Sequence, residues 1–378
     1  MIRLAVVGVG KMGLSHLAIA NMHPGIEVAA VCESSGYVRG VLGKYTGLRM
    51  FGDYERMLSE VELDAVLVAT PSKTHSALVR SALGRGLHVF CEKPLALDPD
   101  DSARLAALAA ERGVVTQVGY HHRFLGSFRE VRKLLDAGAI GSISSAQGEA
   151  YGPVVLKRKG GTWRSRKTEG GGSLYDYAAH PIDLLNWYRG DPIGVGATAM
   201  TSIFSREIDD EVISTLFYGD GSTARVTVNW SDESCRKMTT KVSLWGTGGR
   251  ISADRQECQV YLRGTAPIPP GYQQGWNVRY TTELTEPVDF YLRGEEYSAQ
   301  FDHFVERVRA ADPDGLNGFE SAAATDRVIA MMVADAAKDV PTPAIAEPAG
   351  APRRERRFRL PRPKRHEAVA VRRFEPRG

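Results

Sequence analysis

Asp176 and His180 form the first pair in this 378-residue chain whose residue types and spacing could do chemistry. They follow three glycines at 170–172, and a spacing of four places both side chains on one helix face. A carboxylate beside an imidazole can fix its tautomer and stabilise the imidazolium, which makes His180 a candidate proton acceptor. Most D-x-x-x-H pairs are ion pairs on a helix surface, but the glycine run favours close approach to a ligand.

Lys93 is the next candidate, between Glu92 and Pro94 and directly after an apolar segment at 87–91. Most lysines in such turns are simply solvated. A lysine at the carboxyl end of a buried strand, however, can hydrogen-bond a substrate hydroxyl and favour the alkoxide that develops as hydride leaves. The sequence places no further acid or histidine beside Asp176 and His180 to complete a ligand set. We therefore expect no metal site.

The N-terminal segment 4–13 reads LAVVGVGKMG, a short apolar strand followed by the spacing G-x-G-x-x-G. Gly8 permits the turn, Gly10 lets a pyrophosphate approach the backbone, and Gly13 lets the next helix pack closely on the strand. The start of that helix then faces the phosphates with unpaired N–H groups. Glu33 follows a second apolar strand, where its carboxylate can accept hydrogen bonds from ribose hydroxyls. The pattern predicts a dinucleotide site.

Glu33 also favours NAD over NADP, because an acidic group would repel a 2′-phosphate. Ser34 and Ser35 follow it, and Arg39 could swing in. NADP therefore stays open as the less favoured cofactor.

The first 122 residues alternate short apolar strands with helical segments, which predicts a parallel, doubly wound sheet. The expected strands are 4–7, 28–32, 49–51, 63–69, 87–91 and 114–118, and the expected helices are 14–22, 36–45, 53–59, 72–83 and 98–112. Ligands sit at the carboxyl ends of such strands. One crevice should therefore be ringed by Gly8, Glu33, Thr70, Glu92 and Tyr120.

From residue 123 the pattern changes to several strands with hairpin-like turns, which predicts an α+β domain with a large, mostly antiparallel open sheet. The expected strands are 143–151, 193–204, 211–218, 222–230, 239–246 and 257–262, and the expected helices are 127–137, 173–188, 295–311 and 320–338. The predicted domains are thus a Rossmann domain at 1–122, a substrate-binding and oligomerisation domain at 123–346, and a basic tail at 347–378.

Composition bounds the class of protein. With 43% hydrophobic and 25% charged residues the chain is typical of globular proteins, and no apolar run approaches the ~20 residues of a membrane span. We expect no signal peptide, and four scattered cysteines without C-x-x-C spacing favour reduced thiols in the cytoplasm.

The net charge of +3 hides an asymmetry. The tail carries 11 Lys+Arg and 4 Asp+Glu, so the remaining 37 Lys+Arg and 41 Asp+Glu leave a mildly acidic body. We expect the Pro- and Arg-rich tail to be disordered. Nucleic-acid binding by the tail is the less favoured alternative to an arm that reaches a partner subunit through Phe358, Leu360 and Phe374.

Several motifs together resemble the Gfo/Idh/MocA family of sugar and inositol oxidoreductases. They are VGVGKMG at 7–13, ATPSKTH at 69–75, CEKP at 91–94, VGYHHRF at 118–124 and GGGSLYDYAAH at 170–180. The resemblance covers the chain to about residue 340. It implies a Rossmann domain and a second domain whose open sheet makes oligomer contacts.

By motif match, Lys93 would be the lysine of the E-K-P motif, His180 the acid/base and Asp176 its partner. The cofactor would be bound by Gly8, Gly10, Lys11, Met12, Gly13, Glu33, Ser34, Thr70, Pro71, His75, Glu92, Lys93 and His121. Relatives often carry Asn or Gln at position 121 or 122, where this chain has His121 and His122.

The resemblance and the residues together predict an NAD-dependent dehydrogenase that reversibly oxidises a ring secondary hydroxyl of a sugar or glycoside. An aminoglycoside or another antibiotic-pathway sugar is one candidate. The expected substrate contacts are Lys93, Tyr120, Arg123, Tyr151, Trp163, Arg164, Asp176, Tyr177 and His180.

Three alternatives stay open: an inositol 2-dehydrogenase, a keto-sugar nucleotide reductase, and a non-catalytic NAD(P)-sensing regulator. The regulator is disfavoured because Lys93, Asp176 and His180 are all present. A homodimer or homotetramer through the second domain's sheet is expected, without membrane contact.

Overall fold

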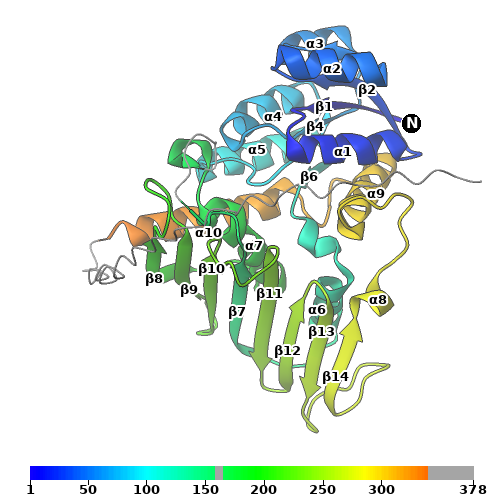
Figure 1. Ribbon diagram of the computed structural model, residues 1–378. Coiled ribbons are helices and arrows are strands. Elements are labelled where there is room, and N and C mark those ends of the chain that lie inside the picture. Colours follow the sequence, from blue (N-terminus) through cyan, green and yellow to red (C-terminus); the bar gives the residue numbers. More distant parts are fainter. Residues whose placement is uncertain (158–164, 339–378) are drawn as a thin grey trace, which may run out of the picture. The chain divides into compact units, whose positions relative to one another are not determined.

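The computed structural model describes residues 1–157 and 165–338, and Figure 1 shows their two sheets and the helices around them. The segment Met1–Lys338 is one compact unit. Trp163 and Arg164 lie outside the described residues, as does the tail with Phe358, Leu360 and Phe374. No helix in the described part of the chain is long and apolar enough to cross a membrane.

The first sheet contains six parallel strands in the order β3-β2-β1-β4-β5-β6. The chain builds outward from β1 to β3 and then returns to lie on the other side of β1, which confirms the predicted doubly wound arrangement. The strands are β1 Ile2–Val7, β2 Ile26–Cys32, β3 Met50–Phe51, β4 Ala65–Val68, β5 His88–Cys91 and β6 Thr116–Val118.

Helices connect these strands and begin where their capping residues predict. The Asp53 carboxylate accepts a hydrogen bond from the Arg56 amide, and Asp98 accepts one from the Asp100 amide, so each satisfies an amide of the first helical turn. The helices are α1 Lys11–Met22, α2 Gly36–Thr46, α3 Tyr54–Glu60, α4 His75–Gly84 and α5 Pro99–Arg112.

The second sheet has eight strands in the order β14-β13-β12-β11-β7-β10-β9-β8. Only β7 and β10 pair in parallel, so the sheet is mostly antiparallel, as predicted. The strands are β7 Ile143–Tyr151, β8 Gly194–Thr201, β9 Glu211–Phe217, β10 Thr223–Asn229, β11 Thr239–Gly246, β12 Gly249–Asp254, β13 Glu257–Leu262 and β14 Gly275–Tyr280.

Strands β12 and β14 were not predicted from the sequence. Strand β12 follows β11 after two residues and places only Ile251 and Ala253 in the core among glycine and polar residues. Strand β14 exposes Trp276, Val278 and Tyr280, and its other side chains are polar or glycine. Strand β12 carries no strong apolar signal, whereas β14 alternates apolar and polar residues, and both are held by pairing with their neighbours.

Helices cover one face of this sheet, and α7 crosses β7, β10 and β11. The other face is open and carries Ile213, Phe217 and Tyr261 at more than a third of full exposure. The helices of this half are α6 Gly126–Asp136, α7 Ala179–Arg189, α8 Thr281–Leu284, α9 Glu295–Ala310 and α10 Phe319–Ala336.

The last two helices return to the first domain. Phe301 and Phe304 of α9 pack with Phe90 of β5 in one buried cluster that also contains the core side of β1. Helix α10 packs on α5 and β6. The chain beyond residue 290 therefore completes the core of the Rossmann sheet.

Candidate active site

The glycine-rich loop joins β1 to α1 with the backbone geometry that its motif requires. Gly8 has φ +85°, a conformation that side chains rarely adopt. A Cβ on Gly13 would lie 1.9 Å from the carbonyl oxygen of Gly8, whereas a Cβ on Gly10 would meet nothing within 4 Å. Gly13 thus permits close packing and Gly10 faces open space, so the loop fits a pyrophosphate at the start of α1, beside Lys11 and Met12.

Glu33 lies against this loop at the end of β2. Its Oε2 accepts a hydrogen bond from the Val9 amide at 3.0 Å, and its Oε1 accepts one from the Ser35 amide at 2.8 Å. The Arg39 guanidinium donates to the carbonyl oxygens of Glu33 and Ser34 at 2.6 and 2.7 Å. The carboxylate therefore lies beside the glycine-rich loop at the end of β2, with an arginine bound to the neighbouring backbone.

The carboxyl ends of the parallel strands meet at one edge of the first sheet. Inter-strand bonds run from the Gly8 amide to Cys32, from the Ala69 amide to Val7, and from the Glu92 amide to Val68. Each predicted crevice residue comes directly or shortly after the end of one of these neighbouring strands. The structure therefore brings all five to one edge of the sheet: Gly8, Glu33, Thr70, Glu92 and Tyr120.

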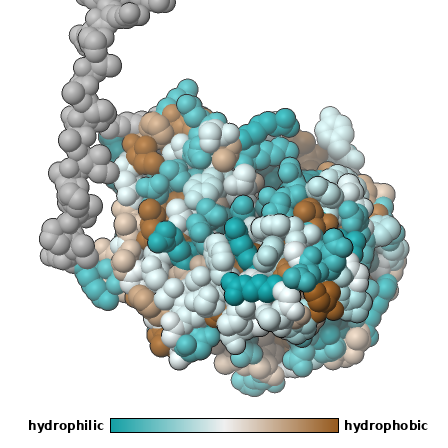
Figure 2. Space-filling model, turned by 90° about the horizontal axis from the view of Figure 1, so that it is seen from below, coloured by the Kyte–Doolittle hydropathy of each residue, from teal (hydrophilic) through white to brown (hydrophobic). Residues whose placement is uncertain are grey.

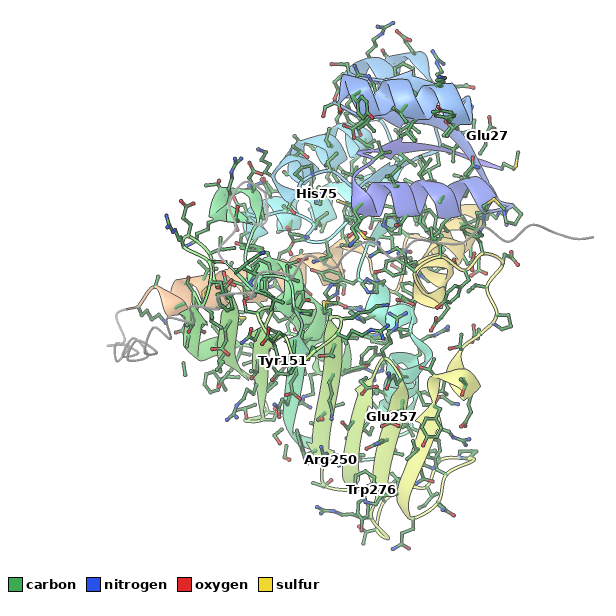
Figure 3. All side chains as sticks on the ribbon, in the orientation of Figure 1. Glu27, His75, Tyr151, Arg250, Glu257 and Trp276 are labelled. Atoms are coloured by element: carbon green, nitrogen blue, oxygen red, sulfur yellow. The ribbon has the colours of Figure 1, made fainter. Side chains whose placement is uncertain are left out.

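His75 lies inside the protein near this edge (Figure 3). Its Nδ1 contacts the carbonyl oxygen of Pro94 at 2.8 Å, and its Nε2 contacts that of Thr70 at 2.9 Å. Burial lowers the pKa of His75. The ring therefore lies between the loop after β4, including Pro71, and the turn after β5, and the single N–H of the neutral imidazole donates to one of the two carbonyl oxygens.

Glu92 is the buried neighbour of Lys93. Its Oε1 lies 2.6 Å from His16 Nε2, and its Oε2 accepts from the Lys93 amide at 3.2 Å. Burial raises the pKa of Glu92, but the hydrogen bond and charge of His16 together with the charge and amide of Lys93 outweigh it and leave that pKa below its ordinary value. Glu92 thus fixes the turn that carries Lys93.

Lys93 and Asp176 form an ion pair between the turn after β5 and the segment before α7. Lys93 Nζ lies 2.9 Å from Asp176 Oδ1 and donates to the Asp176 carbonyl oxygen at 2.8 Å. Both side chains are mostly buried, with 13% and 15% exposed. A partly desolvated pair of this kind is held in one geometry, so the ammonium is fixed at the carboxyl end of β5.

The predicted helix at 173–188 begins with a π turn, Leu174–Ala178, and becomes α-helical only in α7. The four-residue spacing of Asp176 and His180 therefore does not stack them as in a regular helix. Gly172 has φ +116°, and Asp209 accepts hydrogen bonds from Ser173 Oγ and the Leu174 amide, each at 2.7 Å. Asp209 anchors this turn, and no local signal in the sequence pointed to it.

Three histidine rings converge beside this turn. His180 Nδ1 lies 3.2 Å from His122 Nδ1, and the His121 ring centroid lies 4.3 Å from that of His122 and 5.1 Å from that of His180. Burial lowers the pKa of all three histidines, and the charge of Lys93 lowers each further. The expectation that no further histidine lies near His180 was wrong, because nothing local in the sequence shows that positions 121 and 122 return to α7.

The ring nitrogens of these three histidines lie within 4.8 Å of one another, which is close enough for one metal ion. Lys93 and Arg255 bring positive charge to the same place, as their effect on the pKa of His122 shows. Such charge opposes a cation, and we keep the prediction of a metal-free site.

The other predicted substrate contacts that the structure describes include three tyrosines. Tyr120 is buried with its ring edge-on to His180, and Tyr177 packs against Trp230. Tyr151 ends β7 toward the Rossmann domain, whereas Arg250 and Trp276 lie toward the other end of the sheet (Figure 3). The Tyr151 hydroxyl donates a hydrogen bond to the Glu149 carboxylate, and burial raises the pKa of Tyr151 to about 12.

Arg123 faces a different partner. Its Nη2 lies 2.6 Å from Asp183 Oδ1, both side chains are buried, and its Nη1 donates to the Leu316 carbonyl oxygen. The structure therefore gives the Arg123 guanidinium to a buried ion pair that ties α7 to the chain before α10, and does not bring it to Lys93 and His180.

A Rossmann sheet whose glycine-rich loop and strand ends face a lysine, a carboxylate and a buried histidine defines a dinucleotide-dependent oxidoreductase. A model described as an oxidoreductase family with an NAD-binding Rossmann fold matches residues 2–120, and a model of the GFO/IDH/MocA C-terminal domain matches residues 128–252. The chain belongs to the Gfo/Idh/MocA oxidoreductase family, as the motifs predicted.

Individual relatives resemble nearly the whole described chain. The rhizopine catabolism protein MocA of Rhizobium meliloti is 26% identical over 348 residues, which cover 89% of this chain and 94% of that protein. GenD2 from gentamicin A biosynthesis, solved in complex with NAD, is 25% identical with a TM-score of 0.71 and covers 89% of this chain and 94% of its own.

Levoglucosan dehydrogenase, solved with NADH and levoglucosan, has a TM-score of 0.78 at 20% identity and covers 90% of this chain and 100% of its own. At that identity the likeness concerns the fold alone.

Proposed function

We propose that this chain is an NAD-dependent dehydrogenase that reversibly oxidises a secondary ring hydroxyl of a sugar or glycoside to a ketone. The observation that carries the proposal is the fixed pair of Lys93 and Asp176 beside His180, at the carboxyl ends of the Rossmann strands. A positioned cation and a neutral imidazole are what removal of a hydroxyl proton needs.

His180 is the proposed proton acceptor. Burial and the charge of Lys93 hold the pKa of His180 well below its ordinary value, so the ring is neutral and can take a proton. Lys93 hydrogen-bonds the reacting oxygen and stabilises the negative charge that develops on it. Asp176 holds Lys93 in place through its 2.9 Å contact. A bound nicotinamide would accept the hydride from the carbon that carries this oxygen.

Glu33 supports NAD as the cofactor. Two backbone amides hold its carboxylate beside the glycine-rich loop, where it would meet a 2′-phosphate with like charge. Arg39 binds two backbone carbonyl groups there, and an exchange of these bonds for a phosphate is the route by which NADP would be used.

The proposed substrates are glycosides with a secondary ring hydroxyl, with aminoglycosides first among them. The similarity to GenD2 from gentamicin A biosynthesis supports this choice. The acidic body of the chain suits a cationic ligand. Levoglucosan, an anhydrosugar, belongs in the same test because its dehydrogenase shares the fold.

We further propose that copies of the chain associate through the open face of the second sheet. Exposed apolar and aromatic side chains from β9, β13 and β14 support this, namely Ile213, Phe217, Tyr261, Trp276, Val278 and Tyr280. On the face seen from below, hydrophobic residues are dispersed among hydrophilic ones (Figure 2).

The four unpaired cysteines support a reducing compartment such as the cytoplasm.

Absorbance at 340 nm tests the proposed activity. Purified protein would be incubated with NAD or NADP and a panel of aminoglycosides, simple glycosides, levoglucosan and inositols, with His180→Ala as the control. We expect NADH to form with one class of ring alcohol and not with the variant. Silence across the panel despite tight NADH binding would favour a reductase or a cofactor-sensing regulator.

A further inference from the structure

His122 and His180 share a hydrogen bond that neither the motifs nor the proposed mechanism requires. Their Nδ1 atoms lie 3.2 Å apart, with ring centroids at 4.6 Å and ring planes at 88°. The two residues are 5% and 4% exposed. Two ring nitrogens at this distance bond only if one carries a hydrogen and the other a lone pair.

The surroundings keep both rings neutral, so the pair has one proton between these nitrogens. Burial, together with the charges of Arg255 and Lys93, lowers the pKa of His122 to about 3. The other groups that face the ring are His121 from the same turn and the apolar ring of Phe128 from α6. Arg255 is itself paired with Glu296.

The direction of the bond decides which nitrogen of His180 can react. If His180 donates from Nδ1, its Nε2 holds a lone pair; if it accepts at Nδ1, its Nε2 carries a hydrogen and cannot take a proton. The sequence predicted Asp176 as the partner of His180, but Asp176 Oδ1 accepts a hydrogen bond from Lys93 Nζ. None of the described residues hydrogen-bonds to His180 Nε2, which is the nitrogen left for a substrate.

We propose that His122 is the positioning residue for His180: its Nδ1 accepts the Nδ1–H of His180 and thereby presents Nε2 as the proton acceptor. The proposal rests on the dehydrogenase function. As the hydride leaves the carbon, the hydroxyl proton moves to Nε2, and the proton on Nδ1 stays between the two rings. His122 therefore shares the positive charge of the imidazolium, a role that a carboxylate fills in other acid/base histidines.

Nuclear magnetic resonance of ¹⁵N-histidine-labelled protein tests the tautomer without any substrate. Long-range ¹H–¹⁵N spectra separate protonated from unprotonated ring nitrogens, and the His180→Ala and His122→Ala variants assign the two rings. We expect Nδ1–H on His180 and a bare Nδ1 on His122, and a mixture of His180 tautomers in His122→Leu. A hydrogen on Nε2 of His180 in the unaltered protein would overturn the proposal.

Kinetics of a matched pair, His122→Asn and His122→Gln, test the consequence. Asparagine places an amide oxygen near the position of Nδ1, whereas glutamine extends it toward the position of Nε2. We expect Asn to keep kcat within about 3-fold. We expect Gln and Leu to lower kcat about 10- to 100-fold, with KM and NADH affinity within about 3-fold, part of the ~10²- to 10⁴-fold that a positioned base supplies.

Equal kcat values in Asn, Gln and unaltered proteins would refute the positioning role. Melting temperature and NADH binding are measured for each variant, and should Leu fail to fold, the Asn and Gln pair still decides. The two proposals fail differently. An inactive protein with the expected tautomer refutes the dehydrogenase, and an active one with Nε2–H on His180 refutes the role of His122.

Discussion

His75 and His180 are two motif histidines at the same depth, 1% and 4% exposed, and burial lowers the pKa of both. They differ in what their nitrogens contact. His75 places one nitrogen on the Pro94 carbonyl and the other on the Thr70 carbonyl. His180 places Nδ1 on His122. A buried histidine with both nitrogens occupied braces two loops, whereas one with a nitrogen left over can react.

The largest expected effect is on turnover in His180→Ala. Removal of the proton acceptor should lower kcat/KM by about 10²- to 10⁴-fold, while the melting temperature and NADH affinity change little. Steady-state rates at 340 nm and a fluorescence titration with NADH measure the two quantities. A rate within 3-fold of the unaltered protein would remove His180 from the mechanism.

His75→Ala should show the opposite pattern. The variant loses two buried contacts and leaves a small cavity, so the free energy of unfolding should fall by about 2–4 kcal/mol. Its kcat, measured well below the melting temperature, should fall far less than that of His180→Ala. Denaturant unfolding gives the first quantity, and a large loss of kcat in a folded protein would place His75 with the reacting groups.

Asp326 of α10 is a buried carboxyl group that, like the His180 ring, hydrogen-bonds to the described residues through only one of its two polar atoms. Its Oδ2 accepts from Ser102 Oγ and the Ala96 amide, whereas Oδ1 is buried without a partner among the described residues. Burial raises the pKa of Asp326 to about 7. Because its hydrogen bonds go to Ala96 and Ser102 and not to Lys93, Asp176 or His180, we expect the unpaired atom to affect stability more than turnover.

The sign of that effect follows from the raised pKa. The folded protein holds the Asp326 proton up to about pH 7, whereas the unfolded chain releases it near the ordinary value of 3.8. Stability from this group is full below pH 3.8 and is lost as pH rises to about 7. Asp326→Asn should remove this loss, on the order of 2–4 kcal/mol. Unfolding at pH 5 and pH 8 measures it, and an equal slope in both proteins would contradict the assignment.

A smaller effect concerns the pH dependence of oxidation. The pKa of His180 lies well below 6.5, so the neutral base persists in mild acid and the acidic limb of kcat/KM should fall below pH 6.5. A profile from pH 4.5 to 9 with constant ionic strength checks this. A limb at or above pH 7 would contradict the lowered pKa of His180.

The smallest expected effect is that of a chelator. Because Lys93 and Arg255 bring positive charge to the three histidines, dialysis against EDTA should leave turnover within about 20% of its starting value, since hydride transfer needs no metal. Metal analysis of the same sample is the control. Loss of turnover that zinc restores would assign His121, His122 and His180 to a metal.

How far the sequence predicted the site depended on the distance between partners along the chain. Gly8, Asp53 and Asp98 act on neighbouring residues, and the turn at Gly8 and the helices that begin near Asp53 and Asp98 were predicted. The bond between His122 and His180 joins residues 58 positions apart, and that between Arg123 and Asp183 joins residues 60 apart. No local pattern distinguishes such pairs from solvated side chains, so only the fold reveals them.

The same limit applies to the π turn and to Asp209. The glycines at 170–172 predicted close approach to a ligand, but at Gly172 the structure shows a backbone that only glycine readily adopts, against the Asp209 carboxylate. Strand β12 was missed because its apolar content is low, and β14 was missed although Trp276, Val278 and Tyr280 alternate with polar residues. By contrast, β7, β11 and β13 alternate strongly and matched their predicted ranges.

The return of α9 to the Rossmann sheet has a consequence for synthesis on the ribosome. Phe301 and Phe304 cover Phe90, so a nascent chain that has emerged only as far as residue 290 still shows that apolar surface to water. The nucleotide-binding half therefore cannot complete its core when its own residues have emerged; it waits for almost the whole described chain. A stalled or truncated polypeptide of this length would be a client for chaperones.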